Sequence, residues 1–353
     1  MKHFVYTSQP QRVLFGPGSI QNLNEEAQGL GITRALVLST GPQRDQAEFA
    51  ADLLGANAAG IFDAARMHVP VETVRAALAQ GHEMKADGLV SIGGGSTVGL
   101  AKAIALETGL PILAIPTTYA GSEMTSIYGM TDGGLKQTGR DPRVLPRTVI
   151  YDPDLTHALP VSVSITSGLN AIAHAAEGLY AQDANPIMSL MAQEGIGAVA
   201  RGLSSIRADA NDREGRDQAL YGAWLCGTVL GNVGMALHHK LCHTLGGSFN
   251  LPHAETHTVV LPHAMAYNAP EAKEAMAAIQ KALGNTGASA AASLFDLAAG
   301  LGAPTTLKEL GMREEDLDRA VDIALANPYW NPRPIERRPL RQLLQNAYEG
   351  RRP

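Results

Sequence analysis

Short apolar β runs alternate with amphipathic helical segments in the first third of the chain. The β runs cover residues 34–40, 58–62, 88–92 and 111–115, and the helical segments cover residues 43–54, 71–85 and 98–107. Strands that alternate with helices of about 10–15 residues are typical of β-α-β units with a parallel sheet. The pattern therefore predicts an α/β domain with a Rossmann-like parallel sheet.

The pattern changes in two steps further along. Residues 126–147 read as two short strands around a turn at Gly133-Gly134, and residues 148–151 read as the last strand. After Pro160 almost all segments have helical periodicity: residues 162–180, 186–206, 212–233 and 236–249, with two or three more helices between residues 270 and 326. We therefore predict an α/β domain at 1–159, an all-helical domain at 160–353, and an active site in the cleft between them.

Composition excludes several classes of protein. The 353 residues are 45% apolar with a net charge of -6, and no apolar run reaches the length of about 20 residues that spans a bilayer. The chain opens without the apolar core of a signal peptide, and it has no long basic run. Cys226 and Cys242 form no CxxC pair and lie in apolar helical pattern, which favours reduced core thiols. These features predict a cytoplasmic protein that binds neither membranes nor nucleic acid.

The stretch Gly93-Gly94-Gly95-Ser96 lies between a β run and a helix. Glycines let the backbone approach an anion closely, and the following helix N-terminus offers free N–H groups. A tight turn without a ligand would look similar, and the stretch is not the GxGxxG of a Rossmann chain. Its position nevertheless predicts a phosphate-binding turn.

A second candidate for anion binding is the loop at residues 116–123, where Thr117, Thr118 and Ser122 offer hydroxyls after a β run. An ordinary polar loop would have the same composition. Thr40 ends the β run at 34–40 and lies in the turn to the next helix, where an NAD-specific enzyme commonly places an acidic residue. Because Thr40 is uncharged and would not repel a 2′-phosphate, we expect both NADH and NADPH to be accepted.

Six of the 11 histidines fall within residues 238–263. His239 and His243 are four residues apart, and His253 and His257 repeat that spacing. Residues four apart share a helix face, and Gly246-Gly247 and Pro252 would break the stretch so that a second helix folds back. The spacing predicts that four imidazoles converge, although dispersed surface histidines are the alternative. Asn170 and His174, one helical turn apart, are candidates for the same site.

These motifs together resemble the iron-containing (type III) alcohol dehydrogenase family over essentially the whole chain. The family patterns GGGSxxDxAK, PTTxxxGSE, DxxxHAxE and HxxxHxLGxxxxxPH correspond to residues 93–102, 116–123 (one residue shorter), 170–177 and 239–253. The resemblance implies a dehydroquinate synthase-like two-domain fold with a dinucleotide in the α/β domain. It also implies, in most members, a divalent metal held by one Asp and three His in the cleft.

The sequence departs from the family pattern at two places. Asn170 stands where the family has a metal-ligand Asp, and Gly99 replaces the Asp of the Gly-rich motif. Both departures are similar to the maleylacetate reductase branch, as are residues 4–19 and 327–334. The resemblance implies NAD(P)H-dependent reduction of the carbon–carbon double bond of 2-maleylacetate to 3-oxoadipate. This step serves the breakdown of resorcinol, hydroxyquinol and chloroaromatics, and a homodimer is the family default.

A carboxamide is a neutral and poor metal ligand, so Asn170 should weaken Fe²⁺ binding. We expect that neither iron nor zinc is required, with His174, His239 and His253 as the remaining ligands if an ion binds. These three residues and Asn170 would line a polar catalytic site. His243, which matches the substrate-side His of the family, is our candidate for proton donor or enolate stabiliser.

The substrate is a dicarboxylate, so cationic partners are expected near the site. Our candidates for substrate binding are Lys240, His257 and Arg333, with Arg333 as the first choice. Three other functions stay open on the sequence: a metal-dependent alcohol or polyol dehydrogenase of the same family, a lyase like dehydroquinate synthase, and a non-catalytic dinucleotide-binding protein.

Overall fold

The computed structural model describes residues 3–133 and 135–353, so Gly134 of the expected turn and the first two residues of the chain lie outside the described part. The chain divides into two compact units. One unit is Ser8–Leu159, and the other is Pro160–Pro353 together with the segment before Ser8. The change of sequence pattern near residue 160 coincides with the division, whereas the segment before Ser8 groups with the helices.

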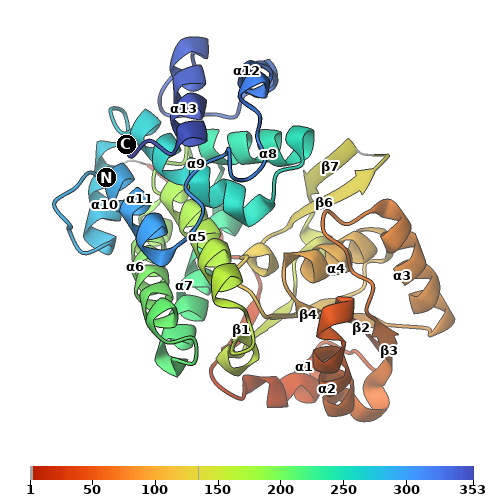
Figure 1. The fold of residues 1–353 in the computed structure, drawn as a ribbon. Helices are drawn as coiled ribbons and strands as arrows, with labels where there is room; N and C mark the ends of the chain where they lie inside the picture. The colour runs from red at the N-terminus through yellow and green to blue at the C-terminus, as the bar shows by residue number, and fades with distance from the viewer. Residues whose placement is uncertain (1–2, 134) are drawn as a thin grey trace. The chain divides into compact units, whose positions relative to one another are not determined.

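The first unit is built on a six-stranded sheet, whose strands lie in the order β1-β8-β5-β4-β2-β3 (Figure 1). The strands are β1 (Arg12–Phe15), β2 (Ala35–Leu38), β3 (Ala58–Phe62), β4 (Gly88–Gly93), β5 (Ile112–Pro116) and β8 (Thr148–Tyr151). Every pairing in this sheet is parallel. The expected α/β fold with a parallel sheet is confirmed.

Helices cover both faces of this sheet. They are α1 (Leu23–Gly29), α2 (Arg44–Leu54), α3 (Val71–Glu83) and α4 (Gly95–Thr108). Successive side chains of a strand point to opposite faces. In β2, Val37 therefore packs with α1 and α2, whereas Leu36 and Leu38 pack with α3 and α4. Two apolar cores, one on each face, thus fix the sheet between two helical layers.

The hairpin expected within residues 126–147 is present as a separate two-stranded sheet. Strands β6 (Ile127–Asp132) and β7 (Leu135–Arg140) pair antiparallel. Gly133 has a φ of +53°, a left-handed conformation that glycine adopts readily. The hairpin prediction is therefore confirmed for the described residues.

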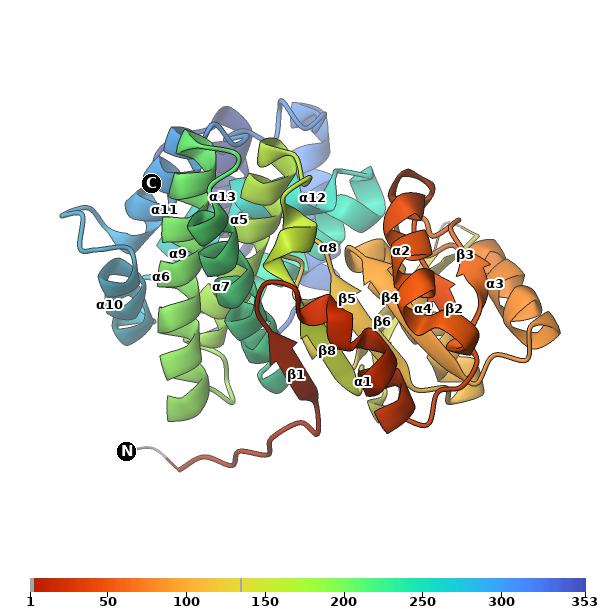
Figure 2. The same cartoon turned by 90° about the horizontal axis from the view of Figure 1, so that it is seen from below.

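The second unit is helical. Its helices are α5 (Val161–Gly178), α6 (Pro186–Ala208), α7 (Arg213–Asn232), α8 (Leu237–Phe249), α9 (His253–Asn268), α10 (Lys273–Ala282), α11 (Ala290–Leu301), α12 (Leu317–Ala326) and α13 (Arg337–Glu349). Figure 2 shows α5, α6 and α7 side by side. Glycines permit this close approach: a Cβ on Gly202 of α6 would lie 2.5 Å from the backbone N of Ala219 in α7.

The break between α8 and α9 differs from the prediction. Gly246 and Gly247 lie inside α8, and the helix continues through them to Phe249. The chain turns at Asn250, whose φ of +55° is left-handed, and Pro252 precedes α9. Interior glycines cost a helix only about 1 kcal/mol each, which packing can offset, whereas Asn is one of the few residues that tolerates the left-handed end position.

One helix of the second unit was not predicted. Helix α13 carries Leu340, Leu343, Leu344 and Ala347 on its buried face. These residues lie at positions i, i+3, i+4 and i+7, the spacing of an amphipathic helix, but arginines and a proline at the start of the segment obscure the pattern.

Both cysteines are free and buried, as expected. Within residues 3–133 and 135–353, no single helix is long and apolar enough to cross a membrane, although α7 and α8, bent by 96° at their break, pass that test as a pair.

Candidate active site

The carboxyl ends of β2 and β4 form a topological switch point in the first unit. These strands are neighbours, but α2 follows β2 on one face of the sheet and α4 follows β4 on the other. Open α/β sheets bind ligands at such a point. Thr40 follows β2, and Gly93, Gly94, Gly95 and Ser96 connect β4 to the first turn of α4.

Steric constraints explain the glycines of this turn. Gly93 has a φ of +148°, and a Cβ there would lie 2.5 Å from Thr97 Oγ1. A Cβ on Gly94 would lie 3.0 Å from Thr118 Cγ2, and the Thr117 amide donates to the Gly93 carbonyl at 3.1 Å. The Gly-rich turn and the loop after β5 are therefore in direct contact.

Gln43 connects this pair of loops to the end of β2. Its Nε2 donates to Thr117 Oγ1 at 2.8 Å, and its Oε1 accepts from Thr40 Oγ1 at 3.1 Å. The structure thus brings together the expected cofactor residues that follow β2, β4 and β5.

Ser122 is held by a buried lysine. The Lys102 ammonium donates to the Ser122 carbonyl at 2.6 Å, to Thr125 Oγ1 at 2.9 Å and to the Ile127 carbonyl at 2.8 Å. Burial lowers the pKa of Lys102 to about 7, against the attraction of Glu123. Lys102 therefore anchors the segment after the second loop to α4.

Six imidazoles in the second unit form what we call the histidine cluster: His174 of α5, His238, His239 and His243 of α8, and His253 and His257 of α9. The His239 ring centroid lies 5.2 Å from that of His174 and 4.9 Å from that of His257. The His253 and His257 centroids are 4.4 Å apart. The predicted convergence of four imidazoles from the two spacings of four residues is confirmed.

The cluster has a buried part and an exposed part. His174, His238, His239 and His257 are buried, whereas His243 and His253 are exposed. Burial, followed by repulsion from neighbouring imidazoles, lowers the pKa of His174 and His257 well below the ordinary value. Burial likewise lowers the pKa of His238 to about 3. His174, His238 and His257 are therefore neutral at pH 7, and His238 Nε2 lies 2.9 Å from His257 Nδ1 in a hydrogen bond.

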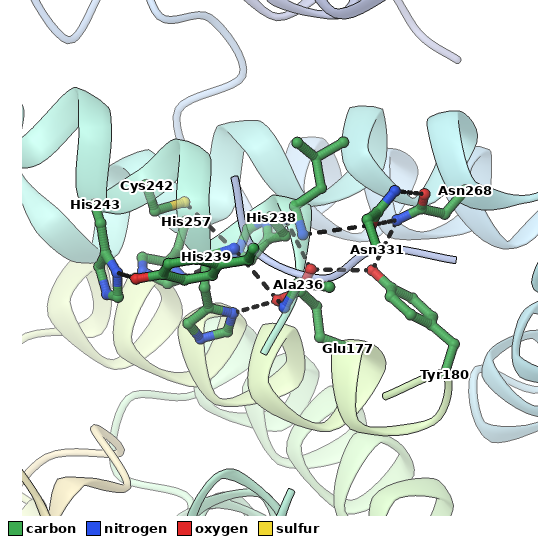
Figure 3. Close-up of polar contacts among 12 residues, drawn as sticks. Glu177, Tyr180, Ala236, His238, His239, Cys242, His243, His257, Asn268 and Asn331 are labelled. Carbon is green, nitrogen blue, oxygen red and sulfur yellow. Dashed lines mark hydrogen bonds and ion pairs between the residues drawn. The ribbon is translucent and has the colours of Figure 1, made fainter. Parts of the chain in front are cut away.

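A buried carboxylate, that of Glu177, contacts the imidazole of His239 (Figure 3). Its Oε2 accepts from His239 Nδ1 at 2.7 Å and from the Ala236 amide at 2.8 Å, and its Oε1 accepts from the His238 amide at 2.8 Å. Burial opposes the charge of Glu177. The hydrogen bond and charge of His239, the attraction of His238 and the Ala236 amide outweigh burial and lower the pKa of Glu177 to about 2.

The exposed imidazole of His243 has a phenol partner. Its Nδ1 lies 3.0 Å from the Tyr329 hydroxyl, and the Lys240 ammonium lies 5.6 Å from the centre of the Tyr329 ring. Partial burial lowers the pKa of Lys240. His243, Tyr329 and Lys240 thus form one group that contains a titratable imidazole and a cation.

Arg333 has a different environment. Its guanidinium lies 4.2 Å from the centre of the Tyr267 ring and donates to the Tyr267 carbonyl at 2.8 Å. These contacts fix the segment at residues 327–334 to α9. They leave the proposed role of Arg333 in substrate binding untested.

The family resemblance implies a metal ion, and the side chains do not fit Fe²⁺. Asn170 Oδ1, His174 Nδ1 and His239 Nε2 are buried and have no hydrogen-bond partner among the described residues, but the oxygen belongs to a neutral amide. The carboxylate next to the cluster, Glu177, is occupied by His239 and by backbone amides. Fe²⁺ favours a set with a carboxylate ligand.

A second donor group, His238, Cys242 and His257, has ligand atoms within 4.8 Å of one another. The 2.9 Å between His238 Nε2 and His257 Nδ1 is a hydrogen-bond distance. Two nitrogens on one tetrahedral zinc ion lie about 3.3 Å apart, since each bond is about 2.0 Å long. The observed geometry is therefore that of a hydrogen bond.

Four residues of the site were not singled out from the sequence: Gln43, Lys102, Glu177 and Tyr329. Lys102 had a usable signal, because it is a lone lysine in the apolar segment at residues 98–107. Glu177 ends the matched pattern at residues 170–177, and Tyr329 lies in the matched segment at residues 327–334. Their contacts, with residues 62 and 86 positions away, are not encoded in a local pattern.

Comparison with known families identifies both units. Residues 10–153 match the model of iron-containing alcohol dehydrogenase, and residues 164–348 match the C-terminal model of the Fe-containing alcohol dehydrogenase family. The chain belongs to the iron-containing alcohol dehydrogenase family.

Within this family, the chain is similar to maleylacetate reductases. It is 59% identical to the maleylacetate reductase of Burkholderia cepacia over 100% of both chains. The crystal structures of maleylacetate reductase from Agrobacterium tumefaciens and from Rhizobium sp. strain MTP-10005 are 55% and 54% identical, each with a TM-score of 0.96 and 100% coverage of both chains.

Proposed function

We propose that the chain reduces the carbon–carbon double bond of 2-maleylacetate to 3-oxoadipate with NADH or NADPH. The similarity to maleylacetate reductases over the whole length supports this function. The observation that carries it at the site is His243, an exposed imidazole paired with Tyr329 beside neutral imidazoles and the Asn170 amide. This set suits charge stabilisation by hydrogen bonds.

The reduction of maleylacetate requires a hydride donor and a proton donor. The hydride of the reduced nicotinamide adds to the alkene carbon that is β to the ketone. The electrons of the double bond move toward the ketone oxygen, which gives an enolate. A proton then adds to the α-carbon, so that one hydride and one proton are taken up in total.

His243 is the residue that we assign to proton donation or enolate stabilisation. Its Nδ1 is engaged with the Tyr329 hydroxyl at 3.0 Å, so the ring is oriented and its Nε2 is the nitrogen that would face the substrate. Hydrogen bonding at one ring nitrogen fixes the role of the other. His239, His253, His174 and Asn170 would complete the polar surroundings.

Lys240, Arg333 and His257 are the proposed contacts of the two substrate carboxylates. Lys240 lies in the same group as His243 and Tyr329 and is only partly buried. His257 is fully buried and hydrogen-bonded to His238, so its contribution would be through the cluster. A cation next to the proton donor would hold a carboxylate close to the reacting double bond.

The dinucleotide is assigned to the switch point of the first unit, at Thr40, Gly93–Ser96, Thr117, Thr118 and Ser122. The helix N-terminus of α4 supports phosphate binding there. The uncharged Thr40 supports use of both NADH and NADPH. Hydride transfer then requires the bound nicotinamide to reach the substrate at His243.

A homodimer in the cytoplasm, acting in aromatic catabolism, completes the proposal. Exposed apolar side chains at the start of the chain (Phe4, Val5 and Tyr6) and the edge strand β1 support self-association. The two free thiols support a reducing compartment.

The test is the initial rate of NADH oxidation with maleylacetate, on enzyme prepared with and without exhaustive chelation. We expect the same rate in both preparations, because no step needs an ion. A rate that disappears on chelation and returns with Fe²⁺ or Zn²⁺ would keep the reaction but refute its metal independence. Turnover of alcohols with NAD⁺, without reduction of maleylacetate, would refute the proposed reaction.

A further inference from the structure

Glu177 has no role in the proposed reaction, yet it is the most heavily bonded side chain around the histidine cluster. It is fully buried near the end of α5. Besides His239 Nδ1, its carboxylate accepts from the amides of Ala236 and His238 and from the Tyr180 hydroxyl at 3.2 Å. A buried carboxylate is costly unless it is satisfied in this way.

Part of this bonding is structural. The first amides of a helix have no partner within the helix, and α8 begins at Leu237. Glu177 accepts from the amides on either side of that residue, so it caps α8 at the point where the histidines begin. This alone would make Glu177 important for stability without any role in the reaction.

The contact with His239 has a further consequence. An ionised carboxylate can only accept hydrogen bonds, so at 2.7 Å the Nδ1 of His239 must carry the proton. In the neutral ring, Nε2 then has a lone pair and no proton. This Nε2 is buried among the rings of His174 and His257 and has no hydrogen-bond partner among the described residues.

We propose that Glu177 is a positioning residue that holds the proton of His239 on Nδ1 and keeps His239 Nε2 as a hydrogen-bond acceptor. His239 then cannot donate to the developing enolate, and this role falls to His243. The proposal rests on the proposed function for its effect on rate, but the proton position can be measured without turnover.

The direct test is ¹⁵N NMR of the ring nitrogens in the full chain labelled with ¹⁵N-histidine, with His239 assigned from the His239→Gln spectrum. We expect the neutral form with the proton on Nδ1. In Glu177→Gln, the Nε2-protonated form should gain population, because a neutral amide oxygen accepts more weakly than a carboxylate and holds the proton on Nδ1 less firmly. A wild-type His239 that carries a proton on Nε2, in the neutral or the charged ring, would overturn the proposal.

The matched control is Tyr180→Phe, which removes a partner of the same carboxylate without touching His239. Loss of a residue that orients a functional histidine commonly costs about 10- to 100-fold in activity. We expect a loss of this size in kcat for Glu177→Gln and less than about threefold for Tyr180→Phe. Equal losses in both would indicate a purely structural role and overturn the proposal.

A double-mutant cycle separates positioning from capping. If Glu177 acts through His239, Glu177→Gln should cost little further activity in a His239→Gln background. Fully additive losses would overturn the proposal. Should the wild type fail to reduce maleylacetate, the proposed function would be wrong, but the NMR result on His239 would still decide the proton position.

Discussion

Two cations near the histidine cluster differ in what their charged groups contact. The Lys240 ammonium lies beside the Tyr329 ring, next to the hydroxyl that bonds His243. The Arg333 guanidinium is occupied by the ring and carbonyl of Tyr267. A cation that is already hydrogen-bonded gains less from a substrate carboxylate, so geometry ranks Lys240 ahead of Arg333 as a substrate contact.

We therefore predict that Lys240→Met raises the KM for maleylacetate about 10-fold with kcat changed less than about twofold, because a charge-assisted hydrogen bond contributes about 1.5–3 kcal/mol. Steady-state kinetics with both substrates varied would measure this. Arg333→Met is the matched comparison. It should lower the melting temperature and should change the KM for maleylacetate less than Lys240→Met does. A larger KM effect from Arg333→Met than from Lys240→Met would reverse the ranking.

At the scale of elements, the segment at residues 327–334 is held by a reciprocal pair of amides. Asn331 Nδ2 donates to Asn268 Oδ1 at 2.7 Å, and Asn268 Nδ2 donates to Asn331 Oδ1 at 2.9 Å (Figure 3). Asn268 ends α9, and Asn331 lies two residues after Tyr329. The pair therefore anchors the segment that presents the Tyr329 hydroxyl to His243.

We predict that Asn331→Ala loosens this segment and lowers kcat about 10-fold, because Tyr329 no longer orients His243. Trp330 is one of only two tryptophans, so a Trp224→Phe background isolates its fluorescence. Acrylamide should quench Trp330 more strongly in Asn331→Ala and, by reciprocity, in Asn268→Ala. Asn327→Ala, in the same segment, is the control. Unchanged quenching in the first two variants would show that the amide pair is not the anchor.

The sequence predicts elements better than it predicts contacts between them. The β runs, most helices and the paired His spacings follow from local periodicity and are present in the structure. The break assigned to Gly246-Gly247 was wrong, because packing carries α8 through both glycines. Glu177 and Tyr329 act across 62 and 86 residues. Their roles depend on which helices pack together, and no local pattern encodes that.

At the scale of the whole molecule, buried neutral histidines make stability depend on pH. Burial lowers the pKa of His174 and His257 well below 6.5, that of His238 to about 3 and that of His263 to about 4. Below pH 6.5 the unfolded chain binds protons at these sites that the folded chain does not. The free energy of unfolding therefore falls as pH falls from 6.5 toward 4.

Each such histidine contributes a slope of about 1.4 kcal/mol per pH unit, so the four together give an upper limit of about 5 kcal/mol per unit. Urea unfolding followed by circular dichroism at pH 7.5, 6.5, 5.5 and 4.5 would measure this slope of the free energy of unfolding against pH.

His263→Asn should reduce the slope by about the contribution of one histidine, because burial alone lowers the pKa of His263. His82→Asn, an exposed position on α3, should leave the slope unchanged. A pH-independent midpoint in the wild type would mean that these four imidazoles take up protons as readily in the folded chain as in the unfolded chain. That result would contradict the lowered pKa values of His174, His238, His257 and His263.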